Sequence, residues 1–500
     1  MLPIEAAVDY ATEDGAEGIL FKSAKSSGHG ESAWWMPLYL RPFLPLPAVN
    51  PAAPNMQEVS DWKIDSWQSR VATQQPNYPD AAALQMALAQ LGRLPPLVTS
   101  WEVDALRAQL AQAQAGRAFV LQGGDCAESF ADCTPDIITN RLKVLLQMSL
   151  VLVHGLSTRV VRLGRFAGQY AKPRSADLET RDGVTLPSYR GDLVNAPEFT
   201  PEARIPDPRR LIEGHANSAM TINFVRGLVD GGFADLHHPE YWNLSWMPHS
   251  PLAKAYRERV ESIGRSLRFM ETLAGQEIHE FNRVDFYTSH EALLLYYEQA
   301  QTRQVPRKPG HYNLSTHFPW IGLRTADLDG AHVEYMRGIR NPVGVKVGPG
   351  VSPDGLRALC DRLDPTHEPG RLTLISRMGA DKIAEGLPPL IEAVRDRPVL
   401  WMADPMHGNT ISTGNGLKTR PFERIQAELL SAFEVHQAHG SRLGGVHLEL
   451  TGEDVTECTG GARQLSETDL ERAYRSNVDP RLNYEQALEM ALTIVDRCGT

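Results

Sequence analysis

Eight short runs of apolar and β-branched residues recur along the chain and predict eight β-strands. They cover residues 118–122, 160–163, 284–288, 319–322, 343–347, 372–375, 399–402 and 445–450. The runs are nearly continuously apolar and do not alternate, which is typical of strands buried on both faces of a parallel sheet covered by helices. Eight is the number of strands in a closed (β/α)8 barrel, so the pattern predicts an α/β protein with a TIM barrel.

Helical periodicity predicts further elements outside the simple barrel. It appears at residues 81–91 and 103–115, before the first strand, and again at 209–229 and 252–273. The last two helices fall between the second and third strands. This connection is longer than a single barrel helix requires. We therefore expect N-terminal helices over residues 58–117 and a catalytic barrel over 118–500, with a helical insertion at about 205–275.

Residues 1–57 look like a separate N-terminal extension. A Gly/Ser-rich patch near residues 26–32 precedes Trp34, Trp35 and several prolines. This composition is compatible with a flexible arm. The aromatic, Pro-rich half can instead dock on the main body or on a neighbouring subunit, because exposed rings are costly in water. Both interpretations stay open at this point.

Composition and charge narrow the functional classes. The chain of 500 residues is 42% hydrophobic with a formal net charge of −11, and it has no long Lys/Arg run, so nucleic acid is not an expected partner. Its five cysteines lack the paired spacings of zinc ribbons or redox dithiols, which fits a reducing cytosol. The first twenty residues are acidic without Lys or Arg, unlike a targeting peptide. No apolar run approaches the roughly 20 residues of a membrane span. We expect a soluble cytoplasmic protein without a membrane partner.

Polar clusters follow the predicted strands, and a barrel brings such strand ends together. Cys126, His407 and Glu449 each follow an apolar run, and Asp479 lies near the C-terminus. A thiolate, an imidazole and carboxylates suit a divalent transition metal such as Mn, Co, Fe or Zn. Each residue alone also has an ordinary structural explanation. For Glu449, we expect one of the pair His447 and Glu449 to face the barrel interior and the other to face outward.

A second group of residues near the strand ends is suited to anions. It consists of Arg165, Lys172, Arg174, Ser175, Arg324, Lys346 and Arg377. Six cations at one rim would repel one another unless anionic ligands lay among them. Arg captures phosphate or carboxylate in a bidentate manner. Two phosphates, or one phosphate and one carboxylate, would balance the charge. Beside a divalent metal, this favours carbonyl activation of a phosphorylated sugar or keto acid and aldol-type carbon bond formation.

Eleven ordered motifs carry a family resemblance over roughly residue 62 to the C-terminus. They are LQGGDCAESF, GQYAKPRSAD, LPSYRGD, TSHEALLL, LDGAHVE, NPVGVKVGP, ISRMGA, DPMHGNT, GLKTRPF, HLELTGEDVTEC and DPRLN. In these segments the chain resembles the type II 3-deoxy-D-arabino-heptulosonate 7-phosphate (DAHP) synthases. The resemblance implies a metal-dependent barrel enzyme. It would condense phosphoenolpyruvate with erythrose 4-phosphate, the entry step of the shikimate pathway to aromatic amino acids or secondary metabolites.

The resemblance also implies roles for individual residues. The implied metal ligands are Cys126, His407, Glu449 and Asp479, and the implied phosphoenolpyruvate contacts are Arg165, Arg324, Lys346 and Arg377. The KPRS run at 172–175, with Lys172, Arg174 and Ser175, matches the erythrose phosphate loop. Glu291 in SHEA resembles another active-site residue. We assign Lys172, Lys346, His407 and Glu291 to catalysis.

The resemblance further implies cofactors, partners and a course of reaction. The metal is expected to be Mn²⁺, with Co²⁺ or another transition metal as alternatives. The resemblance implies a homodimer or homotetramer, aromatic amino acids as effectors and chorismate mutase as a partner. The N-terminal and inserted helices would provide these contacts. C3 of phosphoenolpyruvate attacks the metal-polarised aldehyde, water adds at C2, and phosphate leaves the hemiketal. His407 can also help to move a proton.

Three positions depart from the family pattern. Leu323 stands where an acidic residue is usual, and Ala326 replaces a usual Arg; Leu323 is still expected to contact substrate if this position acts through its backbone N–H. Val478 replaces a frequent Cys, which removes a disulfide partner for Cys126. Two alternatives therefore remain: a synthase for a related amino-sugar aldehyde, or a catalytically reduced regulatory homologue that binds aromatic amino acids. The complete set of candidate ligands argues against the second.

Overall fold

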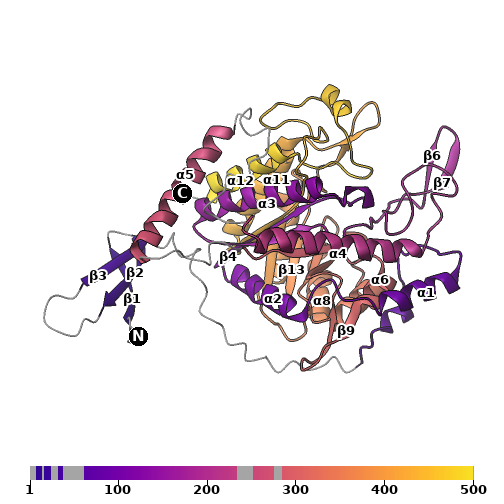
Figure 1. Ribbon diagram of the computed structural model, residues 1–500, viewed down its shortest axis with the longest axis horizontal. Coiled ribbons are helices and arrows are strands. Elements are labelled where there is room, and N and C mark those ends of the chain that lie inside the picture. The colour runs from indigo at the N-terminus through magenta and orange to yellow at the C-terminus, as the bar shows by residue number, and fades with distance from the viewer. Residues whose placement is uncertain are drawn as a thin grey trace.

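Eight parallel strands close into a barrel at the centre of the computed structural model (Figure 1). The structure describes residues 7–13, 16–23, 32–37, 61–233, 252–274 and 284–498. The barrel order is β11-β12-β13-β14-β17-β4-β5-β8. The strands are β4 (Ala118–Gly124), β5 (Arg159–Arg165), β8 (Tyr287–Glu291), β11 (Phe318–Ile321), β12 (Val343–Val347), β13 (Leu372–Ser376), β14 (Val399–Ala403) and β17 (Leu443–Glu449). The predicted (β/α)8 barrel is confirmed.

Each predicted apolar run overlaps one barrel strand, and only the third is clearly displaced. It was expected at 284–288, whereas β8 spans Tyr287–Glu291. The strand continues into polar residues because the fold satisfies them: Ser289 Oγ donates to the Gly164 carbonyl at 3.0 Å, and His290 Nε2 lies 2.8 Å from a Glu298 carboxylate oxygen. Apolar character therefore misplaced a strand whose side chains are buried but polar.

The two helices predicted before the first strand are present, and one of them plugs the barrel. α1 (Ala81–Leu91) agrees with the prediction, while α2 (Ser100–Gln114) begins earlier because Thr99 and Glu102 form a capping box. α2 contacts β4, β5, β14 and β17. Its Leu106, Leu110 and Ala113 pack with interior barrel residues. The N-terminal end of the barrel is thereby closed, and the opposite end remains for the site.

Two inserted helices and a hairpin lie between β5 and β8. They are β6 (Leu178–Arg181), β7 (Val184–Pro187), α4 (Arg209–Asp230) and α5 (Ala253–Ala274). The predicted helical insertion is therefore present, and the β6–β7 hairpin projects from the body in Figure 1. The other helices are α3 (Pro135–Leu156), α6 (Leu295–Gln301), α7 (Ala331–Gly338), α8 (Pro353–Leu363), α9 (Ile383–Gly386), α10 (Pro388–Ala393), α11 (Phe422–Ala438) and α12 (Tyr484–Cys498). Short elements are η2 (Ser66–Ser69), η3 (Phe130–Asp132), η7 (Leu323–Thr325), η8 (Glu467–Arg472), β9 (Thr302–Gln304), β10 (His311–Asn313), β15 (Ile411–Ser412) and β16 (Lys418–Thr419).

Among the described residues, α3 is the one helix long and apolar enough to cross a membrane by length and composition. The sequence interpretation had passed over it. Of its most apolar window, 72% is buried inside the fold, where α3 packs against α12, α4, α5 and the strands β4 and β5. It also carries the buried, ion-paired Arg141. Packing in the core accounts for its composition, as in soluble proteins.

The N-terminal extension contains a three-stranded antiparallel sheet of β1 (Ala7–Glu13), β2 (Ala16–Ser23) and β3 (Ser32–Pro37). Most of the Pro-rich half that was suggested to dock lies outside the described residues, so docking stays a prediction. From residue 61 onward the chain packs on the barrel. Trp62 Nε1 donates to the Glu334 carbonyl of α7 at 3.0 Å, and Trp67 is buried.

Candidate active site

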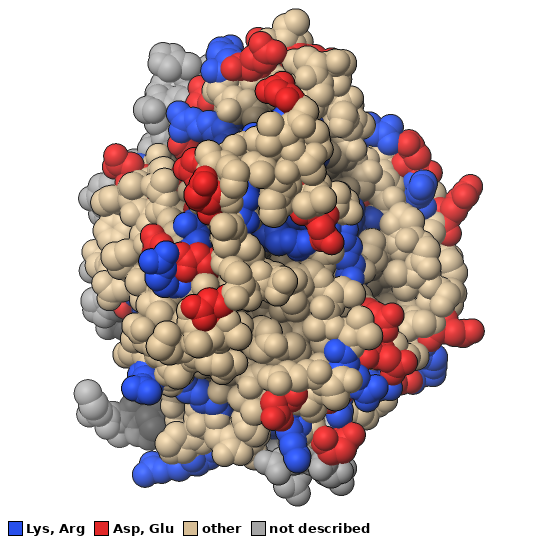
Figure 2. All heavy atoms as spheres, turned by 90° about the vertical axis from the view of Figure 1, so that its right-hand side faces the viewer, with Lys and Arg blue, Asp and Glu red and all other residues tan. Residues whose placement is uncertain are grey.

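A cavity of about 240 Å³ lies where the carboxyl ends of the strands meet. Figure 2 shows Lys and Arg side chains gathered in a hollow on one face of the molecule. The cavity is lined by all seven residues that the sequence suggested for anions: Arg165, Lys172, Arg174, Ser175, Arg324, Lys346 and Arg377. Cys126, Glu291, Leu323, His407 and Asp479 line it as well. Strand ends, rather than neighbouring positions in the chain, bring these groups together.

Two strand-end cations are held by specific partners. Lys346, at the end of β12, is buried and its Nζ bonds the Asp404 carboxylate. Burial lowers the pKa of Lys346 to about 8, against the opposing effect of Asp404. Arg377, directly after β13, donates to the His407 carbonyl at 2.9 Å. The anion-binding side of the cavity is therefore tied to the loop that carries His407.

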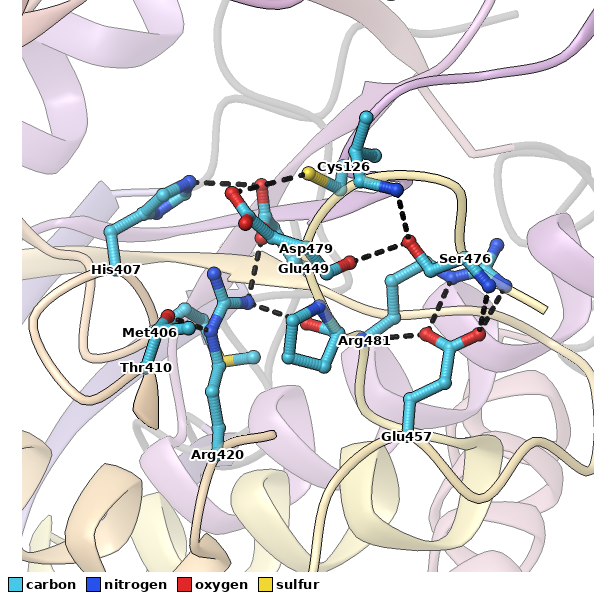
Figure 3. A network of polar contacts seen from close by, with 12 residues as sticks. Cys126, Met406, His407, Thr410, Arg420, Glu449, Glu457, Ser476, Asp479 and Arg481 are labelled. Carbon is cyan, nitrogen blue, oxygen red and sulfur yellow. Dashed lines mark hydrogen bonds and ion pairs between the residues drawn. The ribbon is translucent and has the colours of Figure 1, made fainter. Parts of the chain in front are cut away.

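The four candidate metal ligands converge on one corner of the cavity (Figure 3). His407 Nε2 lies 2.9 Å from Glu449 Oε1, and Cys126 Sγ lies 3.9 Å from Asp479 Oδ2. The ammonium group of Lys172 lies among them, 2.6 Å from Cys126 Sγ, 2.9 Å from Asp479 Oδ2 and 3.7 Å from Glu449 Oε1. A cation therefore already occupies the centre of this anionic group.

The donor set fits a divalent transition metal, although it is not a closed cage. In the described part of the chain, no group of three or more His, Cys, Asp or Glu side chains is already arranged to hold a metal ion. The Lys172 ammonium group contacts Cys126 Sγ, Asp479 and Glu449 at once. His407 Nδ1 lies 2.7 Å from an Asp404 carboxylate oxygen, which orients Nε2 toward Glu449 as in many metal sites. The group offers a sulfur, an imidazole and two carboxylates around a position that attracts positive charge. These are suitable ligands for a divalent transition metal.

Glu449 is surrounded by cations that sequence reasoning had not assigned to it. Arg420 is fully buried and donates to Glu449 Oε2 at 2.6 Å and to the Pro480 carbonyl at 2.6 Å. Arg165 donates to Glu449 Oε1 at 3.0 Å. Arg420 lies in the GLKTRPF motif, whose full burial could not be read from the sequence. It connects the end of β17 with the segment that carries Asp479.

Buried ion pairs join the segment that carries Cys126 to the segment that carries Asp479; Figure 3 shows Arg481 and Glu457 of this group. Arg481 donates to Asp125 at 2.6 Å and to Glu457 at 2.8 Å, and Asp125 also pairs with Arg141 at 2.6 Å. Asp125 precedes Cys126, while Arg481 follows Asp479 by two positions. Sequence reasoning missed these residues. For Asp125, Glu457 and Arg481 the available signal was their place inside GGDCAES, the VTEC segment and DPRLN; Arg141 lies outside these motifs.

The expectation that His447 and Glu449 face opposite sides of the barrel wall is wrong. Residues two apart in a strand point to the same face, and both of these side chains are buried in the interior. His447 Nδ1 lies 2.7 Å from Gln122 Oε1, and its Nε2 contacts Arg165. His447 therefore helps to orient Arg165 and belongs to the site.

A second buried carboxylate joins two cavity loops. Glu428 of α11 accepts from the backbone N–H groups of Met378 and Gly379 at 2.8 and 2.9 Å, and from Asn409 Nδ2 at 2.7 Å. Asn409 Oδ1 in turn accepts from the Ala380 N–H at 3.1 Å. These bonds hold the loop after Arg377 against the loop around His407, another contribution that the sequence did not reveal.

Glu291 ends β8 and faces the cavity. Within the described residues, its Oε1 is buried and has no hydrogen-bond partner. A Cβ at Gly322 would lie only 2.1 Å from this atom, so the carboxylate rests directly on the glycine backbone. Burial raises the pKa of Glu291, against the opposing effects of Lys172 and Lys346. The group is therefore suited to hold a proton.

The three unusual positions have plain structural settings. Leu323 begins η7 and lines the cavity. Ala326 ends this turn and packs partly buried against the core. Val478 packs with Cys126 and Tyr189, and all five cysteines are free.

An eight-stranded parallel barrel with a cation-lined cavity at its carboxyl end defines a class: the β/α-barrel enzymes that act on small anionic substrates. The model of the class-II DAHP synthetase family matches residues 62–495. The chain therefore belongs to the class-II DAHP synthetase family, whose members use a divalent metal. This confirms the resemblance carried by the motifs.

Two curated relatives agree with this membership. The phospho-2-dehydro-3-deoxyheptonate aldolase of Streptomyces coelicolor is 48% identical over 434 residues, covering 86% of this chain and 96% of the relative. The protein of the same name from Neurospora crassa is 47% identical over 453 residues, covering 87% and 94%.

Proposed function

We propose that this chain condenses phosphoenolpyruvate with erythrose 4-phosphate and water to give DAHP and phosphate, the first step of the shikimate pathway. The observation that carries the proposal is family membership over residues 62–495, together with the name shared by the two relatives. The cavity supports it, because seven Lys and Arg side chains line it, and the six assigned to anions from the sequence can balance two phosphates and one carboxylate. The product of this reaction can serve the synthesis of aromatic amino acids or of secondary metabolites.

Two parts of the cavity receive the two substrates in this proposal. Phosphoenolpyruvate is bound by the strand-end group Arg165, Arg324, Lys346 and Arg377. The phosphate of erythrose 4-phosphate is bound by Arg174 and Ser175, which follow β5. Guanidinium groups fix the orientation of a phosphate or carboxylate through paired N–H bonds. C3 of phosphoenolpyruvate and the aldehyde carbon are thereby held in reacting geometry.

Cys126, His407, Glu449 and Asp479 are the ligands that we assign to the divalent metal, which we propose to be Mn²⁺, with Co²⁺ or another transition metal as alternatives. When bound, the ion supplies Lewis-acid polarisation of the aldehyde oxygen. Lys172, whose ammonium group lies between Cys126 and Asp479, would give up these contacts to an ion held by the ligands and would then be available to the erythrose phosphate. Asp404 keeps His407 in one ring orientation, and Glu291 holds a proton beside the substrates.

Removal of metal is expected to abolish the reaction. Metal-stripped protein should consume phosphoenolpyruvate only after Mn²⁺ is restored, because the ligand corner carries the electrophilic activation. The measurement is the loss of phosphoenolpyruvate absorbance with erythrose 4-phosphate present, with the product confirmed by mass. Undiminished turnover in excess chelator would contradict the metal assignment. Turnover only with an amino-sugar aldehyde would favour that alternative, and tight phosphoenolpyruvate binding without turnover would favour a regulatory homologue.

Two substitutions of Leu323 test whether this position binds substrate through its backbone N–H or through its side chain. As the first residue of η7, it has an N–H without an intrahelical partner, and this position tolerates proline. We expect Leu323→Pro, which removes the N–H, to raise KM for phosphoenolpyruvate about tenfold, as loss of a hydrogen bond to a charged group does. Leu323→Glu should keep kcat/KM within about threefold. The measurement is steady-state kinetics of both variants with erythrose 4-phosphate and with the amino-sugar aldehyde. A large change of aldehyde preference in Leu323→Glu would show that the carboxylate matters.

We also propose a cytoplasmic homodimer or homotetramer, with aromatic amino acids as effectors and chorismate mutase as a partner. The support is the exposed apolar surface on the extra helices: Met86 of α1 is 68% exposed and Met220 of α4 is 55% exposed, and α1 and α4 contact each other. Light scattering on the purified chain tests the assembly. A monomer at micromolar concentration would contradict it.

A further inference from the structure

A second cavity, of about 150 Å³, lies at the opposite end of the barrel from the active site. Arg340 and Arg371 line it, and they come shortly before β12 and β13 respectively. The far ends of these strands carry Lys346 and Arg377. Other parts of the wall come from Trp62, Arg107, His311, Asp364 and Glu368. The cavity is thus built by the first residues of two strands together with α2, β10 and the loop after α8.

Four guanidinium groups and two carboxylates line this cavity, and one of the four, that of Arg337, is paired with Glu334 and Asp61 outside the lining. Arg107 pairs with Glu368 at 3.3 Å. Arg371 is buried, and within the described residues its hydrogen bonds go to neutral carbonyls, those of Met336 at 2.9 Å and of Asn341. Within the described residues, Arg340 forms no ion pair. Its Nε is buried without a hydrogen-bond partner, while another part of its guanidinium bonds the Tyr312 side chain. Buried guanidinium N–H groups without an acceptor are unfavourable.

The two carboxylates that line the cavity relieve this imbalance only in part: Glu368 acts on both Arg340 and Arg371 and is shared with Arg107, and Asp364 acts on Arg371. Asp364 accepts from the Glu368 N–H at 3.0 Å, and burial raises its pKa, which favours the neutral form. Burial also lowers the pKa of Arg340, the direction expected for a cation that has lost water without gaining an equal countercharge. An added anion would therefore be favourable here.

One wall of the cavity is apolar and firmly held. Trp62 is fixed through its Nε1, which donates to the Glu334 carbonyl at 3.0 Å, and its ring meets His311 edge to face at 5.1 Å. The ring also lies directly on Gly338, where a Cβ would come within 2.0 Å of it. A concave site with a rigid aromatic wall and a few converging polar groups is typical of small-molecule binding.

We propose that this cavity binds a small oxyanion, through a carboxylate or phosphate group, with Arg340 as its main contact and Arg107 and Arg371 beside it. The planar guanidinium fork matches such groups in a bidentate manner. The bound anion supplies the acceptor that Arg340 lacks and joins the starts of β12 and β13. This site is separate from the catalytic cavity, and the inference does not depend on the proposed reaction.

Hydrogen exchange measured by mass spectrometry on the full chain tests this site locally. With orthophosphate as the probe, and acetate in a parallel sample, peptides covering 305–313 and 337–343 should exchange at least about threefold more slowly in the unmodified protein. The effect should vanish in Arg340→Gln. Phosphate protection of peptides covering 172–176, in the active site, should be the same in both proteins. Arg395→Gln is the matched control, since Arg395 is exposed and pairs with Glu392.

Each result has a defined meaning. Protection by both probes supports a site for oxyanions in general, and protection by one probe alone supports a site selective for that group. Absence of protection in the unmodified protein would overturn the inference, whatever the state of the variant. Protection that persists in Arg340→Gln would overturn it as well. Since the active-site peptides are followed in the same sample, failure of this site is distinguishable from failure of the catalytic one.

Discussion

Replacement of His407 by alanine is expected to lower kcat by at least about a hundredfold. Loss of even an outer partner of a metal ligand reduces metal affinity or activity on the order of 10–100-fold, and His407 is proposed as a direct ligand. Its Nε2 lies 2.9 Å from Glu449, while Asp404 fixes the other ring nitrogen at 2.7 Å. Removing the ring therefore takes away one donor and leaves the buried Asp404 with Lys346 and the backbone N–H groups of residues 406 and 407. The measurements are steady-state kinetics and metal content after dialysis.

A matched histidine controls for the loss of an imidazole as such. His439, just after α11, is part-exposed and pairs with Glu392 at 3.2 Å outside the cavity. His439→Ala should keep kcat and metal content within about twofold, as surface changes usually do. Full activity in His407→Ala would remove His407 from the proposed ligand set. Normal metal content with low kcat would keep His407 in catalysis and remove it from metal binding.

Replacement of Arg481 by methionine is expected to destabilise the fold by about 3–5 kcal/mol, the usual effect of removing one partner from a buried ion pair. Arg481 bonds Asp125 at 2.6 Å and Glu457 at 2.8 Å, and all three are buried. Asp125 retains Arg141, but Glu457 loses its nearest cation and keeps only backbone N–H donors such as that of Ser476 at 2.9 Å. Methionine fills most of the volume, so charge is the main change. Calorimetry should show a melting temperature lower by roughly 3–5 °C.

Arg475 provides the comparison for this variant. It pairs with Glu453 at the surface and its side chain is 61% exposed, and such pairs contribute about 0–1 kcal/mol. Arg475→Met should therefore leave the melting temperature nearly unchanged. Equal melting temperatures for the two variants would refute a stabilising role for the buried ion pairs. Because Arg481 follows Asp479 closely, Arg481→Met should also bind metal more weakly than Arg475→Met.

The sequence located most barrel strands because their burial is recorded in apolar residues. Runs such as 343–347 and 399–402 agree closely with β12 and β14. The third strand was misplaced because β8 carries Ser289 and His290, whose burial depends on partners elsewhere in the chain. The wrong orientation of His447 was a different kind of error, since the two-residue period of a strand already places it beside Glu449 on one face.

The sequence also indicated which side chains line the catalytic cavity, because strand ends in a barrel converge by construction. It did not indicate their pairing. Arg165 meets Glu449 across 284 positions, and Cys126 meets Asp479 across 353. The place of Lys172 among the ligands, the burial of Arg420 and the carboxylate of Glu428 beneath two loops are contacts of this kind.

By itself, the sequence determined the barrel, its inserted helices and the family, because periodic burial and ordered motifs are local properties of the chain. Only the tertiary structure decided which charges neutralise one another, where a cation lies among the four candidate ligands, and that Arg340 forms no ion pair within the described residues. The physical reason is that Coulomb and hydrogen-bond energies depend on distance and burial in space. Separation along the chain does not determine either of these.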